Sequence, residues 1–160
     1  MKALYALAIA GLASGLCLVL IVVLAGRDSS QVDGTAAGPG VVERGAASAD
    51  GPPTSGAQRG DPVEADRVEL SDDEIVAALA LGNVVIAYDG AAPTAVQEEV
   101  SGPYDPELAA AGQAVILARR PGLGGVQALA WERRLVASGP EDPQLTEFAE
   151  AWLGQGAPDG

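Results

Sequence analysis

SDDEIVAALALGNVVIAYDG, residues 71–90, decides the fold, because it holds a complete helix followed by a buried strand. Ser71, with Glu74 three positions later, forms a capping box that marks the start of the helix. Apolar residues follow at helical spacing, and Gly82 is the kind of residue that ends a helix. The run Val84–Tyr88 is apolar throughout and rich in β-branched residues, which is typical of a strand buried on both faces.

Downstream of this stretch the sequence predicts two more strands, at residues 114–118 and 126–131, with the second resuming toward Val136 beyond a turn or bulge. The glycine-rich residues 121–125 lie between two strands and not before a helix, which favours a hairpin turn over a phosphate cradle. The strand at 126–131 is therefore expected to be an antiparallel partner of the strand before it.

Two further helices and one helical turn are predicted in the same region. A second capping box, Thr94 with Gln97, opens a short helix, and a helical turn starts at Asp105-Pro106. The last helix begins after Asp142 and carries an apolar stripe that includes Trp152. The sequence thus predicts a small α+β domain over residues 71–157, with a mixed three- to four-stranded sheet and about three helices.

The N-terminal segment has a different character. Residues 3–26 are an uninterrupted apolar run flanked by Lys2 and Arg27, long enough to cross a bilayer about 30 Å thick. We therefore expect residues 1–26 to be a transmembrane anchor, with the N-terminus cytoplasmic and the remainder exported. Two alternatives stay open: cleavage after a signal peptide at residues 23–25, and lipidation of Cys17.

Between anchor and domain, residues 27–70 are dominated by Gly, Ala, Ser, Asp and Pro, with no aromatic residue and no periodicity. Such a segment buries too little apolar surface to offset the loss of chain entropy. The sequence predicts a flexible linker that holds the domain away from the membrane.

Composition excludes several functions. The chain has a formal charge of −13, which opposes binding to nucleic-acid phosphates. It contains no histidine, and its one cysteine, Cys17, lies within the apolar run, so imidazole chemistry, a disulfide and a thiolate zinc site have no residues to use. We expect no cofactor and no catalytic residue, although acid–base chemistry by carboxylates stays open.

Two pairs of arginines are the only basic residues after residue 70. In an otherwise acidic domain they are candidates for a small anion site, while charge balance at strand ends is the simpler interpretation. The four residues are Arg119, Arg120, Arg133 and Arg134.

Several short motifs resemble a bacterial family, domain of unknown function 3105. Members of that family are often membrane-anchored and carry Pro-Pro-Thr-Ser-Gly-Pro-His, Leu-Glu-His-Gly and Ala-Trp-Gly segments. Here Pro52–Gly56 matches the first motif, Leu79–Gly82 stands at the second, and Ala130-Trp131-Glu132 stands at the third. The resemblance covers roughly residues 51–157 and implies an extracytoplasmic domain on a membrane anchor.

The departures from the family pattern bear on function. The histidines of the family fall on Gln58 and Leu81 in this chain, and its glutamate falls on Ala80. The resemblance therefore implies a member that kept the scaffold without the histidines. Gln58, Leu81 and Trp131 mark where a retained site is expected.

These features favour a non-catalytic binding or accessory module of the cell envelope, with a protein partner there. Two alternatives remain. One is a structural spacer without a specific ligand, and the other is a metal-binding or hydrolytic domain that works through carboxylates alone.

Overall fold

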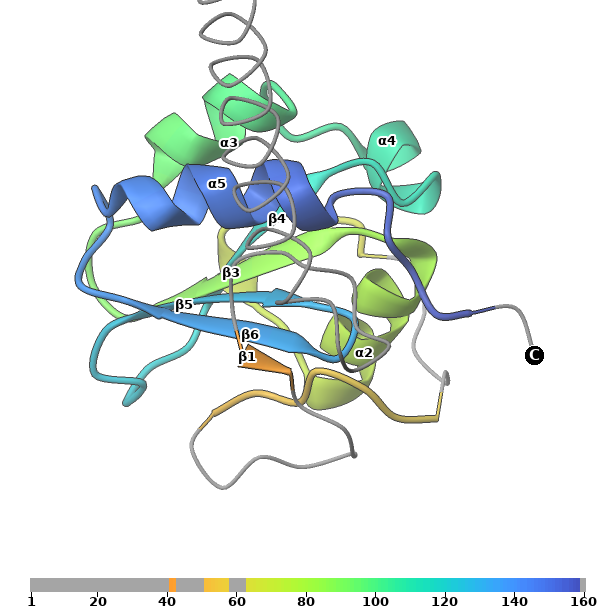
Figure 1. Ribbon diagram of the computed structural model, residues 1–160, viewed down its shortest axis with the longest axis horizontal. Helices are drawn as coiled ribbons and strands as arrows, with labels where there is room; N and C mark the ends of the chain where they lie inside the picture. Colours follow the sequence, from red (N-terminus) through yellow and green to blue (C-terminus); the bar gives the residue numbers. More distant parts are fainter. Residues whose placement is uncertain (1–40, 43–50, 58–62, 159–160) are drawn as a thin grey trace, which may run out of the picture. The chain divides into compact units, whose positions relative to one another are not determined.

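Two parallel strands without charged side chains in their interior, β3 (Val84–Tyr88) and β4 (Val115–Arg119), pair along their whole length. The computed structural model describes residues 41–42, 51–57 and 63–158, and this part of the chain forms one sheet with helices on both faces (Figure 1). The strand order is β1-β6-β5-β3-β4-β2. The other strands are β1 (Val41–Val42), β2 (Val68–Glu69), β5 (Val126–Ala130) and β6 (Arg133–Ala137).

Four helices cover the sheet: α2 (Asp72–Leu81), α3 (Thr94–Val100), α4 (Pro106–Ala110) and α5 (Pro143–Trp152). Side chains of β3 alternate between two apolar clusters, as the period of a strand requires. Val84, Ile86 and Tyr88 face α3 and α5, where Phe148 is fully buried. Val85 faces α2 and α4, where Ile75 is fully buried. The domain is therefore built of three layers, with α5 and α2 on opposite sides in Figure 1.

The α+β class and the mixed sheet are as predicted, but the sheet has six strands and not three or four. The additional strands are β6, which forms a hairpin with β5, and the two short edge strands β1 and β2. A two-residue strand is too short to show alternation, so β1 and β2 left no pattern in the sequence.

The prediction that residues 121–125 form a hairpin is wrong. β5 pairs antiparallel with β3, so β3 lies between β4 and β5. The connection instead wraps the end of β3, where the N–H of Gly122 donates to Asp89 Oδ2 over 2.9 Å and the N–H of Asp89 donates to the carbonyl of Gly125 over 3.0 Å. Turn residues between two strands do not by themselves say which strands pair.

One of the two predicted capping boxes is present. Ser71 and Glu74 cap α2 reciprocally, and the predicted cap Asp142 accepts from the N–H of Gln144 at the start of α5. The box at Thr94 is wrong, because Pro93 is the N-cap of α3 and no side chain caps the helix. Gln97 is instead buried, and its amide donates to the carbonyl of Val115 over 2.9 Å.

The prediction of an unbroken linker up to residue 70 is also wrong. Asp66 accepts from the N–H of Leu117 over 2.8 Å and from Gln97 Nε2 over 3.1 Å. Tyr104 donates its hydroxyl to the carbonyl of Val63 over 2.6 Å, and Val63 is buried. Residues 63–70 thus belong to the domain. The hydrogen bonds that hold them need no apolar periodicity, so the hydropathy pattern does not reveal this segment.

In the part of the chain that the structure describes, no helix has both the length and the hydropathy required to span a bilayer. The predicted anchor, residues 1–26, lies outside that part, as do residues 27–40 of the predicted linker.

Candidate functional site

The arginines predicted as an anion site lie in two separate places. Arg119 ends β4 and Arg120 follows it, whereas Arg133 and Arg134 open β6, and strands β3 and β5 lie between. Arg120 forms an ion pair with Asp72 at 2.8 Å. The four side chains do not converge, and anion binding by either pair stays a prediction.

The pair on β6 is buried. Arg134 donates through Nη1 to Gln127 Oε1 over 2.9 Å and through Nη2 to the carbonyl of Pro52 over 2.6 Å. The guanidinium of Arg133 lies over the ring of Trp152, 4.7 Å from its centroid. Cation–π and hydrogen-bonded contacts of this kind compensate the cost of burying a positive charge. Both arginines therefore join β6 to neighbouring parts of the domain.

The Pro-Pro-Thr-Ser-Gly segment is packed into the domain. Residues 52–55 are all buried, and the carbonyl of Thr54 accepts from the N–H of Glu132 over 2.9 Å. The segment then passes the first turns of α2, where it helps to line a hollow of about 170 Å³. The lining residues are Pro53, Ser55, Gly56, Ala57, Asp72, Asp73 and Val76.

Of the three positions expected at a retained site, the structure describes Leu81 and Trp131. Leu81 is the last residue of α2, 46% exposed, and does not line the hollow beside the first turns of that helix. Trp131 is half-buried against the core on the α2 side of the sheet. Gln58 lies outside the described residues. A retained site at these three positions stays a prediction.

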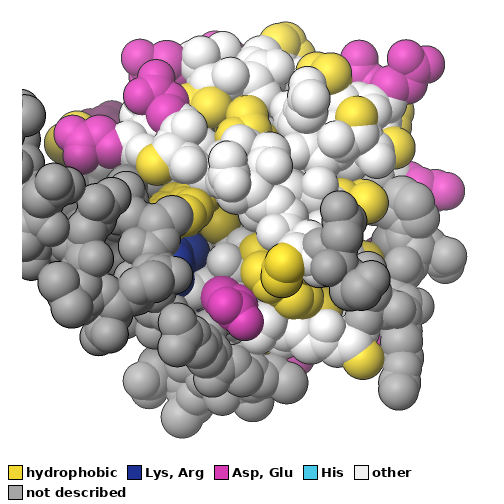
Figure 2. Space-filling view, turned by 45° about the vertical axis from the view of Figure 1, so that its right-hand side comes forward, with side chains coloured by type: hydrophobic (Ala, Val, Ile, Leu, Met, Phe, Trp, Pro, Cys, Tyr) yellow, Lys and Arg dark blue, Asp and Glu magenta, His cyan; other side chains and the backbone are white. Residues whose placement is uncertain are grey.

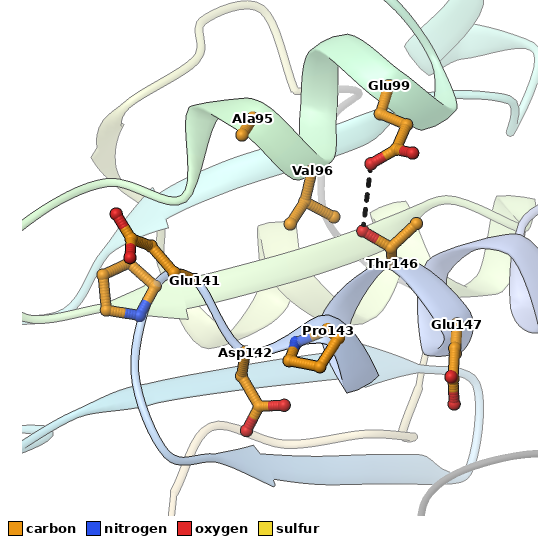
Figure 3. A pocket seen from close by; sticks show the side chains of 9 residues that line it. Ala95, Val96, Glu99, Glu141, Asp142, Pro143, Thr146 and Glu147 are labelled. Atoms are coloured by element: carbon orange, nitrogen blue, oxygen red, sulfur yellow. Dashed lines mark hydrogen bonds between the residues drawn. The ribbon is translucent and has the colours of Figure 1, made fainter.

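A larger hollow lies between α3 and α5, and we call it the α3–α5 groove (Figure 3). It has a volume of about 560 Å³. Val96 points from α3 toward α5, and the carboxylate of Glu99 points toward α5 as well. The lining residues are Ala95, Val96, Glu99, Pro140, Glu141, Asp142, Pro143, Thr146 and Glu147.

The four carboxylates of the groove differ in their partners. Asp142 accepts from the N–H and hydroxyl of Ser138 and from the N–H of Gln144. The backbone donors, first of all the N–H of Ser138, lower the pKa of Asp142. Glu99 accepts from the hydroxyl of Thr146 over 3.4 Å, a long bond that links the two helices.

Neither Glu141 nor Glu147 forms an ion pair within the described ranges. Among the same residues there is no group of three or more acidic or cysteine side chains placed to hold a metal ion. On the face shown in Figure 2, acidic side chains project into solvent, whereas basic atoms are visible only inside a recess. The groove therefore presents negative charge next to an apolar floor.

Sequence reasoning did not find this groove. Its residues come from two segments about forty positions apart, and Glu99 is exposed, as a charged residue on the outer face of a helix usually is. The one usable signal was the Pro-Glu-Asp-Pro run at 140–143, which joins β6 to α5 and forms one end of the groove.

The fold and its surface define a small α+β domain with a mixed sheet, an acidic exterior and a hollow between two helices. The chain belongs to the family described as "Protein of unknown function (DUF3105)", whose model matches residues 45–159. The match begins before Pro52–Gly56 and so includes the packed segment that the composition had assigned to the linker. No curated protein and no solved structure matches the chain.

Proposed function

We propose that this protein is a single-pass membrane protein whose domain faces away from the cytoplasm and acts as a non-catalytic binding module for a protein partner of the cell envelope. The apolar run at residues 3–26 supports the anchor, and its length suits a bilayer core about 30 Å thick. The basic Lys2 ahead of it supports a cytoplasmic N-terminus.

The observation that carries the binding role is the α3–α5 groove. Its volume of about 560 Å³ lies within the range of roughly 300–1,000 Å³ common for ligand sites. A spacer without a ligand has no need of a concave surface that combines apolar carbon with charge. The groove therefore favours a binding module over a spacer.

The groups in the groove suit recognition better than catalysis. They comprise four carboxylates and the hydroxyl of Thr146. A carboxyl that acts as a general acid near neutral pH needs a raised pKa, whereas the pKa of Asp142 is lowered. Asp142 is also occupied in capping α5. These features support a binding role without proton transfer.

Two measurements on intact cells test the proposal. Ala151→Cys places a thiol on an exposed position of α5, away from the groove. A membrane-impermeant maleimide is expected to label this variant in unbroken cells, with the unsubstituted chain as the background for Cys17. Labelling only after lysis would overturn the extracytoplasmic placement.

The binding role is tested separately by photo-crosslinking from a benzoylphenylalanine placed at Ala95, which is exposed and lines the groove. The expected result is one reproducible adduct with an envelope protein. The same probe at Ala110, exposed on α4 outside the groove, is the control. Absence of any adduct from either position would support a spacer.

A further inference from the structure

We infer that the α3–α5 groove binds an extended basic segment of the partner, in which lysine or arginine side chains alternate with apolar ones. This inference rests on the proposed function and specifies the chemistry of its partner.

The floor of the groove is apolar. Val96 lies at its centre and is 4% exposed, so it is part of the core as well as of the floor. Ala95, Pro140 and Pro143 add further carbon surface around it. Water in contact with such a floor is displaced favourably by an apolar side chain, which requires the occupant to carry one.

The rim of the groove is negative on both helices. Glu99 lies on α3 with its carboxylate toward α5, Glu147 lies on α5, and Glu141 lies in the connection before α5 (Figure 3). Helix α3 and residues 137–152 together carry six acidic residues and no lysine or arginine. A positive occupant therefore complements this rim better than a negative or neutral one.

Arg133 is buried, with its guanidinium over the ring of Trp152 at the last residue of α5. It does not line the groove. The rim is thus not neutralised from within the described part of the domain, and a partner can supply the missing charge.

Other occupants fit less well. Anionic lipid headgroups and nucleic-acid phosphates would be repelled by the rim. A second copy of this chain carries the same net charge of −13, which opposes self-association through this face. A bare metal ion would leave the apolar floor uncovered.

The test uses the full chain in nanodiscs of neutral phosphatidylcholine and a fluorescein-labelled peptide, GKLPKALKG, followed by fluorescence anisotropy. We expect saturable binding that weakens as salt rises from about 20 to 200 mM, because exposed charges are screened over about 10 Å at 0.1 M. The acidic peptide GELPEALEG should not bind. The polar basic peptide GKSGKSSKG should bind at least fivefold more weakly, because it cannot cover the floor.

A triple glutamine variant tests the rim. Loss of three exposed charge contacts is expected to weaken binding about tenfold. The variant carries Glu99→Gln, Glu141→Gln and Glu147→Gln. The matched control removes the same formal charge at exposed positions outside the groove and should change binding less than threefold. The control carries Glu98→Gln, Glu107→Gln and Glu150→Gln.

The floor is tested by filling it. Ala95→Trp places an indole at the groove and is expected to weaken binding at least tenfold, whereas Ala151→Trp, exposed on α5 outside the groove, should leave binding unchanged. Both variants place the new ring on an exposed helix position, so neither should prevent folding.

Three results would overturn the inference. The first is an equal loss of binding in the two triple variants, which would indicate bulk charge only. The second is equal binding of the polar basic peptide, and the third is full competition by spermine or Ca²⁺ at stoichiometric concentration, which would indicate a site for small cations. A crosslinked partner that contacts the domain elsewhere would overturn this inference and leave the proposed binding role intact.

Discussion

The backbone N–H of Glu132 donates to the carbonyl of Thr54 over 2.9 Å, and this bond fastens the β5–β6 turn to the Pro-Pro-Thr-Ser-Gly segment. Glu132 makes it from a left-handed backbone conformation, with φ of 54°. Side chains with a Cβ are disfavoured there, and the resembled family motif has glycine at this position.

Replacing Glu132 by glycine is expected to stabilise the domain by about 1 kcal/mol, because glycine adopts positive φ without a steric penalty. Thermal unfolding of the detergent-solubilised full chain, followed by tryptophan fluorescence, measures the change. Glu132→Ala keeps the Cβ while removing the carboxylate and serves as the control. A glycine variant no more stable than the alanine variant would contradict the explanation.

Asp66 should be a sensitive position within residues 63–70. Its side chain is 8% exposed and accepts from Leu117 N and Gln97 Nε2. Asp66→Ala leaves two donors without an acceptor and is expected to cost about 2–4 kcal/mol of unfolding free energy. Asp66→Asn keeps one carbonyl oxygen for Leu117 and should cost less. Equal stability of the wild type and the alanine variant in urea unfolding would contradict the stabilising role of Asp66.

Asn83 joins α2, α4 and β4 through one buried amide. Its Nδ2 donates to the carbonyls of Ala78 and Ala109, and its Oδ1 accepts from the N–H of Ala114 over 2.9 Å. Asn83→Leu leaves the N–H of Ala114 without its acceptor in the core and removes one of the donors to each carbonyl, and it should destabilise by roughly 3 kcal/mol.

The exposed Gln113→Leu is the matched control for Asn83→Leu, since it makes the same kind of change at a solvated position. Hydrogen exchange at Ala114 provides a local readout and should accelerate in the Asn83 variant only. Unchanged protection of the Ala114 N–H would show that its hydrogen bond to Asn83 Oδ1 does not stabilise the domain.

Acid should weaken the domain through its helix caps. The hydroxyl of Ser71, followed by its N–H, lowers the pKa of Glu74, and backbone donors lower the pKa of Asp142. A carboxyl whose pKa is lower in the folded state contributes stability above its unfolded pKa and loses that contribution as pH falls through the folded pKa. Stability should therefore decline below about pH 4.5.

The double variant Glu74→Gln and Asp142→Asn keeps side-chain acceptors at both caps but removes their titration. Its midpoint of thermal unfolding should fall less between about pH 5 and 3 than that of wild type. Glu98→Gln with Glu150→Gln, two exposed helix positions, controls for net charge. Parallel pH profiles for all three proteins would contradict the assignment to the caps.

The elements that could be predicted from sequence are those whose causes are local. Val84–Tyr88 reads as a buried strand because every side chain in it is apolar, and Ser71 with Glu74 caps a helix through contacts three residues apart. Thr94 with Gln97 has the same spacing, yet the amide of Gln97 donates a hydrogen bond to the carbonyl of Val115 on a distant strand. A local pattern gives the wrong answer where a long-range hydrogen bond competes for the same side chain.

The candidate site was beyond local reasoning for a related reason. Its floor and rim come from residues 95–99 and 140–147, and neither segment carries a pattern that differs from an ordinary amphipathic helix and its loop. The groove exists because α3 and α5 pack side by side on one face of the sheet, as shared burial of Val96 and Phe148 indicates. Likewise, the two arginine pairs lie close together in the sequence. They are separated in the sheet because the strand order is not sequential and places β3 and β5 between them.

The way Arg134 holds the carbonyl of Pro52 has a mechanical consequence. Any pull that travels along the chain from its N-terminal side reaches the sheet first at β1, which is joined to β6 over only two residue pairs. The hydrogen bond from the buried guanidinium of Arg134 to the carbonyl of Pro52 is the next contact that resists the pull. We expect tension to separate β1 from β6 at low force. Unfolding should then halt at the hydrogen bond between Arg134 and Pro52, so that the α3–α5 groove keeps its shape under load.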